Sequence, residues 1–418
     1  MNNNIFLWVL YDFANSFLSA ALEGLYFSQW VIIEHGFADI WYGGTYAAAT
    51  LFLLISAPLL GAWSDIIRKR IPFIKWTTLF SVILTMSLGV VATSSISSSP
   101  KVLITLVIFF FIQYFYQASL IYYNPLLHQL STVKTRGAIS GVGQVANNFG
   151  WLLATGLLLL LVNRNFAFIG QPGRAQVFLP SAILFGLFAL PMLLWFKEKT
   201  IESDYPVSNT KMIIINPFKS FFTLLKKNKN VALYLVAFML ISDAILTANL
   251  FFAIFLDRIY YMADNQKFIL LTLMFSITIP GSFIFGKLGD KYGLKKILTV
   301  ASLLLAISFF VISISTSLNI LYLSIIIVGL GWGGYYTSAR ALLVKISPQQ
   351  KLGEYFGYYA VFQKFASIIG PLTWGVVTLL LSNYGVVKYR VAVLALVFLM
   401  LIGTVLLTKV QEEKVKVN

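Results

Sequence analysis

Apolar stretches long enough to cross a lipid bilayer follow one another along almost the whole chain. About 20 consecutive apolar residues span the hydrocarbon core as a helix. Only 11% of the 418 residues are charged, against about one quarter in a soluble domain, and 59% are hydrophobic. Such a chain cannot cover itself with charge, so lipid must cover it. We expect twelve spans, at about 5–33, 40–63, 72–94, 102–127, 138–162, 177–196, 231–257, 267–287, 296–316, 318–344, 354–382 and 388–408.

The connector lengths divide these spans into six plus six. Residues 197–230 form the one long internal connector. We therefore expect an all-α membrane protein with an N-terminal six-helix bundle (1–196), a cytoplasmic connector (197–230) and a C-terminal six-helix bundle (231–418). Within the connector, Asn216-Pro217 predicts a helix start, and Phe and Leu alternating with Lys predict an amphipathic surface helix. A solvated linker is the alternative.

The positive charge is distributed as in a membrane protein with a fixed orientation. The formal net charge is +16, and most of the 31 Lys and Arg residues fall in connectors on one side of the spans. This bias predicts that both termini are cytoplasmic, and it argues against nucleic-acid binding. The start, Met1-Asn-Asn-Asn4, has no basic region, so we expect the first span to be retained rather than cleaved. We therefore expect a multi-pass protein of a prokaryotic inner membrane.

Several function classes have no support in the sequence. The chain has no cysteine and two histidines, so disulfides, thiol chemistry and a Cys or His metal cage are not expected. No phosphate-binding loop is present, and no catalytic cluster or soluble domain indicates an enzyme or a receptor. We therefore expect no cofactor, no metal and no enzymatic activity.

A short motif occurs once in each half, between the second and third span. It has a glycine, an aspartate four residues later and a basic cluster after the aspartate. Because each copy lies at a corresponding place, two diverged six-helix repeats are indicated. The residues of the motif are Gly61, Asp65 and Arg68 in the first copy, and Gly286, Asp290, Lys291 and Gly293 in the second.

This architecture resembles the major facilitator superfamily, whose members consist of two six-helix halves. The second copy matches the family motif well, whereas Arg68 stands where the first copy should have its second glycine. The resemblance implies a cytoplasmic gate, in which ion pairs around the motif form in one state and break in another. Ordinary inner-loop charge is the alternative interpretation.

A narrower resemblance is to the vacuole-effluxer branch, which includes the autophagy-related amino-acid exporters of the yeast vacuole and their prokaryotic relatives. It rests on stretches that run in order along the chain. They are Tyr11-Asp-Phe-Ala-Asn-Ser16, Tyr123-Asn124, Ser338-Ala-Arg340, and Gly353-Glu-Tyr-Phe-Gly-Tyr-Tyr-Ala360 leading to Lys364 and Gly370-Pro371.

Ionisable residues inside the spans are the main candidates for a site, because such groups normally face a partner or a water-filled cavity. The acids could bind an ammonium or a proton and the bases a carboxylate; alternatively, acid and base pair to close a gate. Glu23 is either a proton site or a packed, protonated carboxyl. The asparagines line the cavity or bond across helices. The candidate residues are Asp12, Asn15, Glu23, Asn124, Asn147, Asn148, Asp243, Arg340 and Lys364.

These features together predict a monomeric secondary transporter that moves a small solute through the bilayer by alternating access. The family resemblance implies an amino acid moved outward. Proton coupling is a hypothesis that rests on Asp12, Glu23 and Asp243. The alternative is an exporter of a lipid or amphiphile, since 16% aromatic content also suits an apolar cavity.

Overall fold

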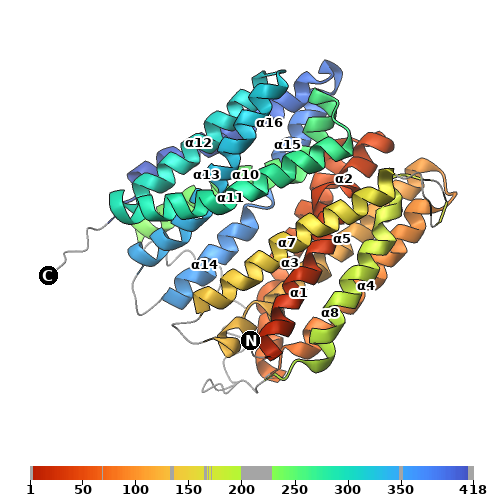
Figure 1. The fold of residues 1–418 in the computed structure, drawn as a ribbon, viewed down its shortest axis with the longest axis horizontal. Coiled ribbons are helices and arrows are strands. Elements are labelled where there is room, and N and C mark those ends of the chain that lie inside the picture. The colour runs from red at the N-terminus through yellow and green to blue at the C-terminus, as the bar shows by residue number, and fades with distance from the viewer. Residues whose placement is uncertain are drawn as a thin grey trace. The chain divides into compact units, whose positions relative to one another are not determined.

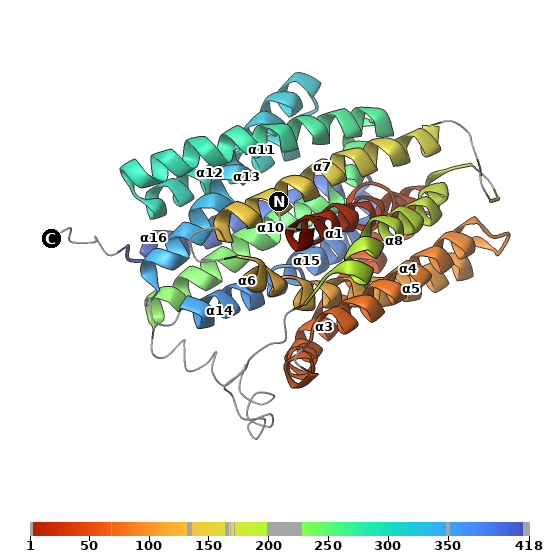
Figure 2. The same ribbon diagram turned by 60° about the horizontal axis from the view of Figure 1, so that its bottom comes forward.

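The computed structural model describes residues 3–67, 69–131, 136–163, 167, 169–170, 172–198, 228–347 and 352–412. The chain forms two compact units, Met1–Pro217 and Phe218–Asn418 (Figures 1 and 2). Most of the predicted connector, including its amphipathic helix, lies outside the described residues.

The prediction of twelve membrane-spanning helices is confirmed within the described residues. The regular elements there are all helical. This follows from the solvent, because in lipid each backbone N–H and C=O must find its partner inside the protein, and a helix provides that locally.

The first span of the first unit is interrupted by two π-helical turns, η1 (Ala20–Gly24) and η2 (Trp30–Glu34). The α-helices of this unit are α1 (Asn3–Ser19), α2 (Phe27–Gln29), α3 (Asp39–Ile67), α4 (Ile71–Thr93), α5 (Ser98–Tyr123), α6 (Leu126–Leu130), α7 (Arg136–Asn163) and α8 (Phe178–Trp195), and η3 (Arg174–Val177) is a short 3₁₀ turn.

The second unit differs from prediction at its fifth span, which was expected to be one helix over 354–382. It is two helices, separated by residues 366–368. The helices of this unit are α10 (Lys229–Tyr260), α11 (Asp264–Tyr292), α12 (Leu294–Ile314), α13 (Leu318–Ile346), α14 (Leu352–Phe365), α15 (Ile369–Leu380) and α16 (Val387–Lys409), with a 3₁₀ turn η6 (Ser382–Tyr384).

In the first unit α1 lies between α7 and α8 (Figures 1 and 2). Tyrosine hydroxyls join it to its neighbours. Tyr26, just after η1, donates to the carbonyl of Thr155 on α7 at 2.8 Å. Tyr123 of α5 donates to the carbonyl of Trp8 on α1 at 2.7 Å. A buried hydroxyl needs such a partner in an apolar interior, so these bonds fix how α1 faces the other helices.

In the second unit glycines allow α11 and α13 to pack backbone against backbone. A Cβ at Gly329 of α13 would lie 2.7 Å from the carbonyl oxygen of Met274. A Cβ at Gly333 would collide with the carbonyl oxygen of Thr278 and lie 2.7 Å from the amide nitrogen of Ser282. Small residues at helix contacts are the usual means of close packing in membranes, where dispersion rather than water exclusion drives association.

The duplicated motif lies mostly in helices rather than in loops. Gly61 belongs to α3, which continues to Ile67, and Asp290 belongs to α11, which continues to Tyr292. In the second copy a single residue, Gly293 with φ +99°, joins α11 to α12. That backbone conformation favours glycine, which explains the glycine of the motif. In the first copy Arg68 and the side chain of Asp65 lie outside the described residues.

Candidate functional site

Asp12 of α1 is half-buried and faces α7. A Cβ at Gly143 of α7 would collide with Asp12 Oδ2, so this glycine leaves room for the carboxylate. Asn147, one turn further along α7, donates from Nδ2 to the main-chain carbonyl of Asp12 at 3.1 Å. The structure therefore brings together two of the predicted site residues, Asp12 and Asn147.

Asn15 lies three residues beyond Asp12 on α1 and is 2% exposed. Its Oδ1 and Nδ2 atoms are both buried, and among the described residues neither has a hydrogen-bond partner. An amide without partners in an apolar interior is unfavourable by about 1–3 kcal/mol per polar group. Asn15 is therefore the polar side chain of this unit that most needs a ligand or a water.

The other candidates of the first unit have different surroundings. Asn148 accepts from Gln144 of its own helix at 3.1 Å. Asn124 is exposed at the C-terminal end of α5. Glu23 is half-buried within the π turn η1. π turns occur often at functional sites, so the turn keeps both interpretations of Glu23 open.

Asp243 of α10 is 0% exposed. Its Oδ1 accepts from the backbone N–H of Gly370 at 2.7 Å, whereas its Oδ2 has no partner among the described residues. Arg340 is exposed on α13, and Lys364 is half-buried in the last turn of α14. Within the described part of the second unit neither base forms an ion pair with Asp243.

The two aspartates occupy equivalent places in their units. In each, an aspartate on the first span meets a glycine on the fifth: Asp12 meets Gly143, and Asp243 meets Gly370. Sequence analysis found the paired aspartates but missed the glycines. The sequence Gly370-Pro371 could have indicated the second glycine, because proline disfavours an unbroken helix at this position.

A second repeated feature lies at one end of each unit, and the sequence analysis missed it. Glu198, just after α8, accepts from the backbone N–H groups of Arg70 at 2.6 Å and Ile71 at 2.9 Å. Glu412, just after α16, accepts from those of Leu294 and Lys295, both at 3.0 Å. Each carboxylate thus satisfies free N–H groups at the start of a third span, where the helix dipole also favours a negative charge.

Asparagines at the start of each unit's first span hold the same two segments, and we call this pair of contacts the amide clasp. Asn4 exchanges two hydrogen bonds with the backbone of Lys197, at 2.8 and 3.2 Å. Asn230 does the same with Gln411, at 2.8 and 2.7 Å. The clasp places Glu198 and Glu412 at their helix ends.

Next to the duplicated motif of the second unit, the carboxylate that forms an ion pair is Glu412 and not Asp290 of the motif. Lys345 pairs with Glu412 at 2.8 Å, whereas the exposed Asp290 has no ion-pair partner among the described residues. Partial desolvation raises the pKa of Glu412, but hydrogen bonds from Lys345, Lys295 and Leu294 outweigh it and hold the pKa below its usual value. The gating role of the motif stays a prediction.

Ionic contacts lie at the opposite end of each unit. Lys267, the first residue of the predicted span 267–287, is 0% exposed on α11. It donates to Asp257 at 2.9 Å and to Asp264 at 3.1 Å. In the first unit Arg174 pairs with Glu34 at 2.9 Å. The two carboxylates compensate the charge of the buried ammonium, and the three side chains together link the end of α10 to the start of α11.

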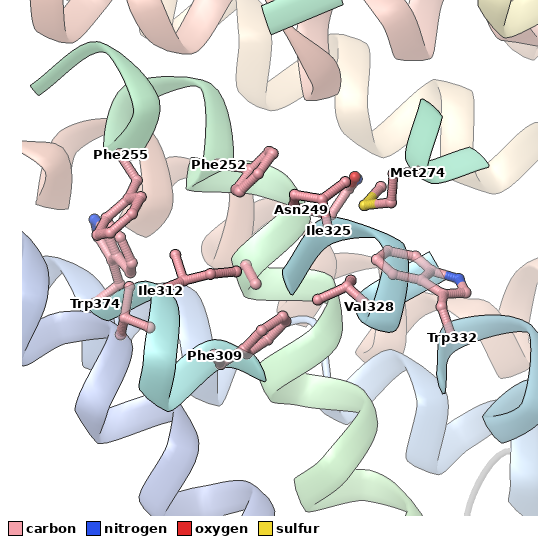
Figure 3. A pocket seen from close by; sticks show the side chains of 12 residues that line it. Asn249, Phe252, Phe255, Met274, Phe309, Ile312, Ile325, Val328, Trp332 and Trp374 are labelled. Carbon is pink, nitrogen blue, oxygen red and sulfur yellow. The ribbon is translucent and has the colours of Figure 1, made fainter. Parts of the chain in front are cut away.

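A narrow apolar cavity of about 40 Å³ lies inside the second unit. Figure 3 shows side chains of several helices converging on it, with Asn249 of α10 as the polar group. Its aromatic lining includes Phe252, Phe309, Trp332 and Trp374.

Twelve candidate membrane-spanning helices in two units, each with an aspartate on its first span, indicate a multi-pass membrane transporter. The Major Facilitator Superfamily model matches residues 247–418. The chain is 26% identical to the uncharacterized MFS-type transporter YxiO of Bacillus subtilis, over 97% of this chain and 94% of that one. The predicted resemblance to the major facilitator superfamily is confirmed.

Two further similarities bear on branch and fold. Autophagy-related protein 22 of Yarrowia lipolytica is 26% identical over 46% of this chain and 37% of its own length, which agrees with the predicted vacuole-effluxer resemblance. The crystal structure of a mutant of the nucleoside transporter NupG superposes with a TM-score of 0.77. At 13% identity it covers 97% of this chain and 99% of that one.

Proposed function

We propose that this transporter moves a small zwitterionic solute of the amino-acid class outward by alternating access, coupled to a cation. The observation that carries the proposal is Asn15, whose buried amide has no partner beside the half-buried Asp12. A carboxylate with an amide next to it suits a substrate ammonium. Arg340 and Lys364, in the second unit, stay predicted groups for binding a carboxylate.

Amino-acid counterflow into liposomes tests this proposal. Asn15→Ala removes the amide and should raise the half-saturating amino-acid concentration roughly tenfold, the value of about one lost hydrogen bond. Asn319→Ala, at an exposed position on α13, is the matched control and should leave counterflow unchanged. Wild-type protein that exchanges no amino acid would contradict the proposal.

Export of an amphiphile is the second candidate, and the apolar cavity of the second unit favours it (Figure 3). The cavity is narrow, so a lipid tail could enter only if side chains such as Trp332 moved aside. Competition separates the two candidates: free amino acids should inhibit transport under the first, and lysolipids under the second.

A further inference from the structure

Two buried oxygen atoms, one helical turn apart on α10, have no hydrogen-bond partner among the described residues. They are Asp243 Oδ2 and Thr247 Oγ1, and both side chains are 0% exposed. Residues four apart share one face of a helix, so the two oxygens point the same way. Unpaired polar atoms inside a membrane protein are unfavourable and mark functional positions.

Both side chains meet Gly370, the second residue of α15. The backbone N–H of Gly370 donates to Asp243 Oδ1 at 2.7 Å. A Cβ at this position would collide with Thr247 Oγ1 and lie 2.8 Å from Asp243 Oδ1. The carboxylate, the hydroxyl and the glycine backbone therefore lie against one another.

The helix break at this place frees main-chain carbonyl groups. Pro371 has no N–H, so the carbonyl of Ser367 lacks the donor that a continuous helix would supply. The N–H of Gly370 donates to Asp243 and not to the carbonyl of Ala366. Unwound carbonyls and the C-terminal end of a half-helix, here α14, are groups that bind coupling cations in transporters.

The first unit lacks this set, although it has the same aspartate. Ser16 corresponds to Thr247, but its hydroxyl donates to the carbonyl of Phe13 at 2.5 Å. Helix α7 passes Gly143 without a break, so its carbonyls keep their helical partners. Within the described residues, an unpaired carboxylate oxygen beside an unpaired hydroxyl is thus particular to the second unit.

An ionised carboxylate at Asp243 needs a cation to balance its charge. No Lys, Arg or His of the described residues forms an ion pair with this fully buried carboxylate. A single ionised carboxylate inside a span is strongly unfavourable unless a positive charge compensates it.

We infer that Asp243, Thr247 and the carbonyls of the α14–α15 break form a binding site for a sodium ion. The ion would be the coupling ion of the proposed transport, and the inference rests on the proposed function only for that role. A proton would satisfy Asp243 Oδ2 but leave the hydroxyl and the carbonyls unpaired, whereas a hard cation takes several oxygen ligands at once. Because all these ligands are oxygens, the scarcity of Cys and His does not bear on the site.

Thermal unfolding of the purified protein tests the site. At constant ionic strength, replacing choline or potassium with sodium should raise the unfolding temperature and saturate. Asp243→Asn should abolish the rise. Thr247→Val should increase the half-saturating sodium concentration at least tenfold, whereas Thr247→Ser should retain the wild-type value. Thr378→Val is the matched control, because that buried hydroxyl bonds to the carbonyl of Trp374 at 3.0 Å.

The inference is overturned if sodium gives no specific rise in the wild type, or if Asp243→Asn keeps the rise. Stabilisation by acid alone would assign the carboxylate to a proton and also overturn it. If Asp243→Asn does not fold, the comparison of Thr247→Val with Thr247→Ser decides. Amino-acid counterflow that does not depend on sodium would remove only the coupling role of the ion and leave amino-acid transport as proposed. Sodium stabilisation without any amino-acid counterflow would leave the sodium site and contradict the proposed function.

Discussion

At the scale of single residues, matching side chains in the two units have different environments. Asp12 is half-buried, with its backbone bonded to Asn147, whereas Asp243 is fully buried with one oxygen unpaired. The sequence identified both aspartates because ionisable residues stand out within apolar spans. The sequence could not show that the two aspartates have different environments, because burial and hydrogen bonding depend on neighbours distant in the chain, such as Gly143 and Gly370.

The carboxylate of Glu412 gives a prediction of pH dependence. Its folded pKa is lowered, so its contribution to stability is present above the unfolded pKa of about 4.3 and is lost as pH falls through the folded pKa. Glu412→Gln should destabilise the protein by about 1 kcal/mol at pH 7, the carboxylate being partly exposed. Unfolding temperatures of both proteins between pH 7 and pH 3 check this. A difference that stays constant down to pH 3 would contradict it.

At the scale of helices, the twelve spans follow from hydropathy, because length and polarity alone decide which segments enter lipid. The ends of the helices and the breaks within them do not follow from hydropathy. The helix of the second motif copy continues to Tyr292 and stops at Gly293, and the fifth span of the second unit is divided at residues 366–368. The sequence analysis predicted one helix here, although Pro371 could have indicated the break. The acceptor for the freed N–H of Gly370, Asp243, comes from another helix.

Close packing of α11 against α13 yields a prediction at this scale. Gly333→Ala should destabilise the second unit by about 1–3 kcal/mol, because its Cβ would meet the rigid backbone at Thr278 and Ser282. Gly44→Ala in α3 is the matched control, since a Cβ there meets nothing within 4 Å. Thermal unfolding of both variants in detergent measures the difference; equal unfolding temperatures would mean that the two helices can separate at little cost.

At the scale of the whole molecule, membrane orientation is a proposal that rests on the distribution of positive charge. The absence of cysteine makes it easy to test. Ser97→Cys, before α5, should react with a membrane-impermeant maleimide in intact cells. Gln411→Cys, after α16, should react only after permeabilisation. Both positions are exposed. The opposite labelling pattern would place the termini outside.

The sequence by itself determined the class of protein: twelve apolar spans, two repeated halves and acids on the first span of each. These are properties of composition and order, and lipid as the solvent permits few alternatives. Only the tertiary structure decided which polar groups lack partners and which helix ends are closed by Glu198 and Glu412. The physical reason is that hydrogen-bond satisfaction depends on pairs of distant segments, and a glycine or a hydroxyl acquires its role from the atom it meets.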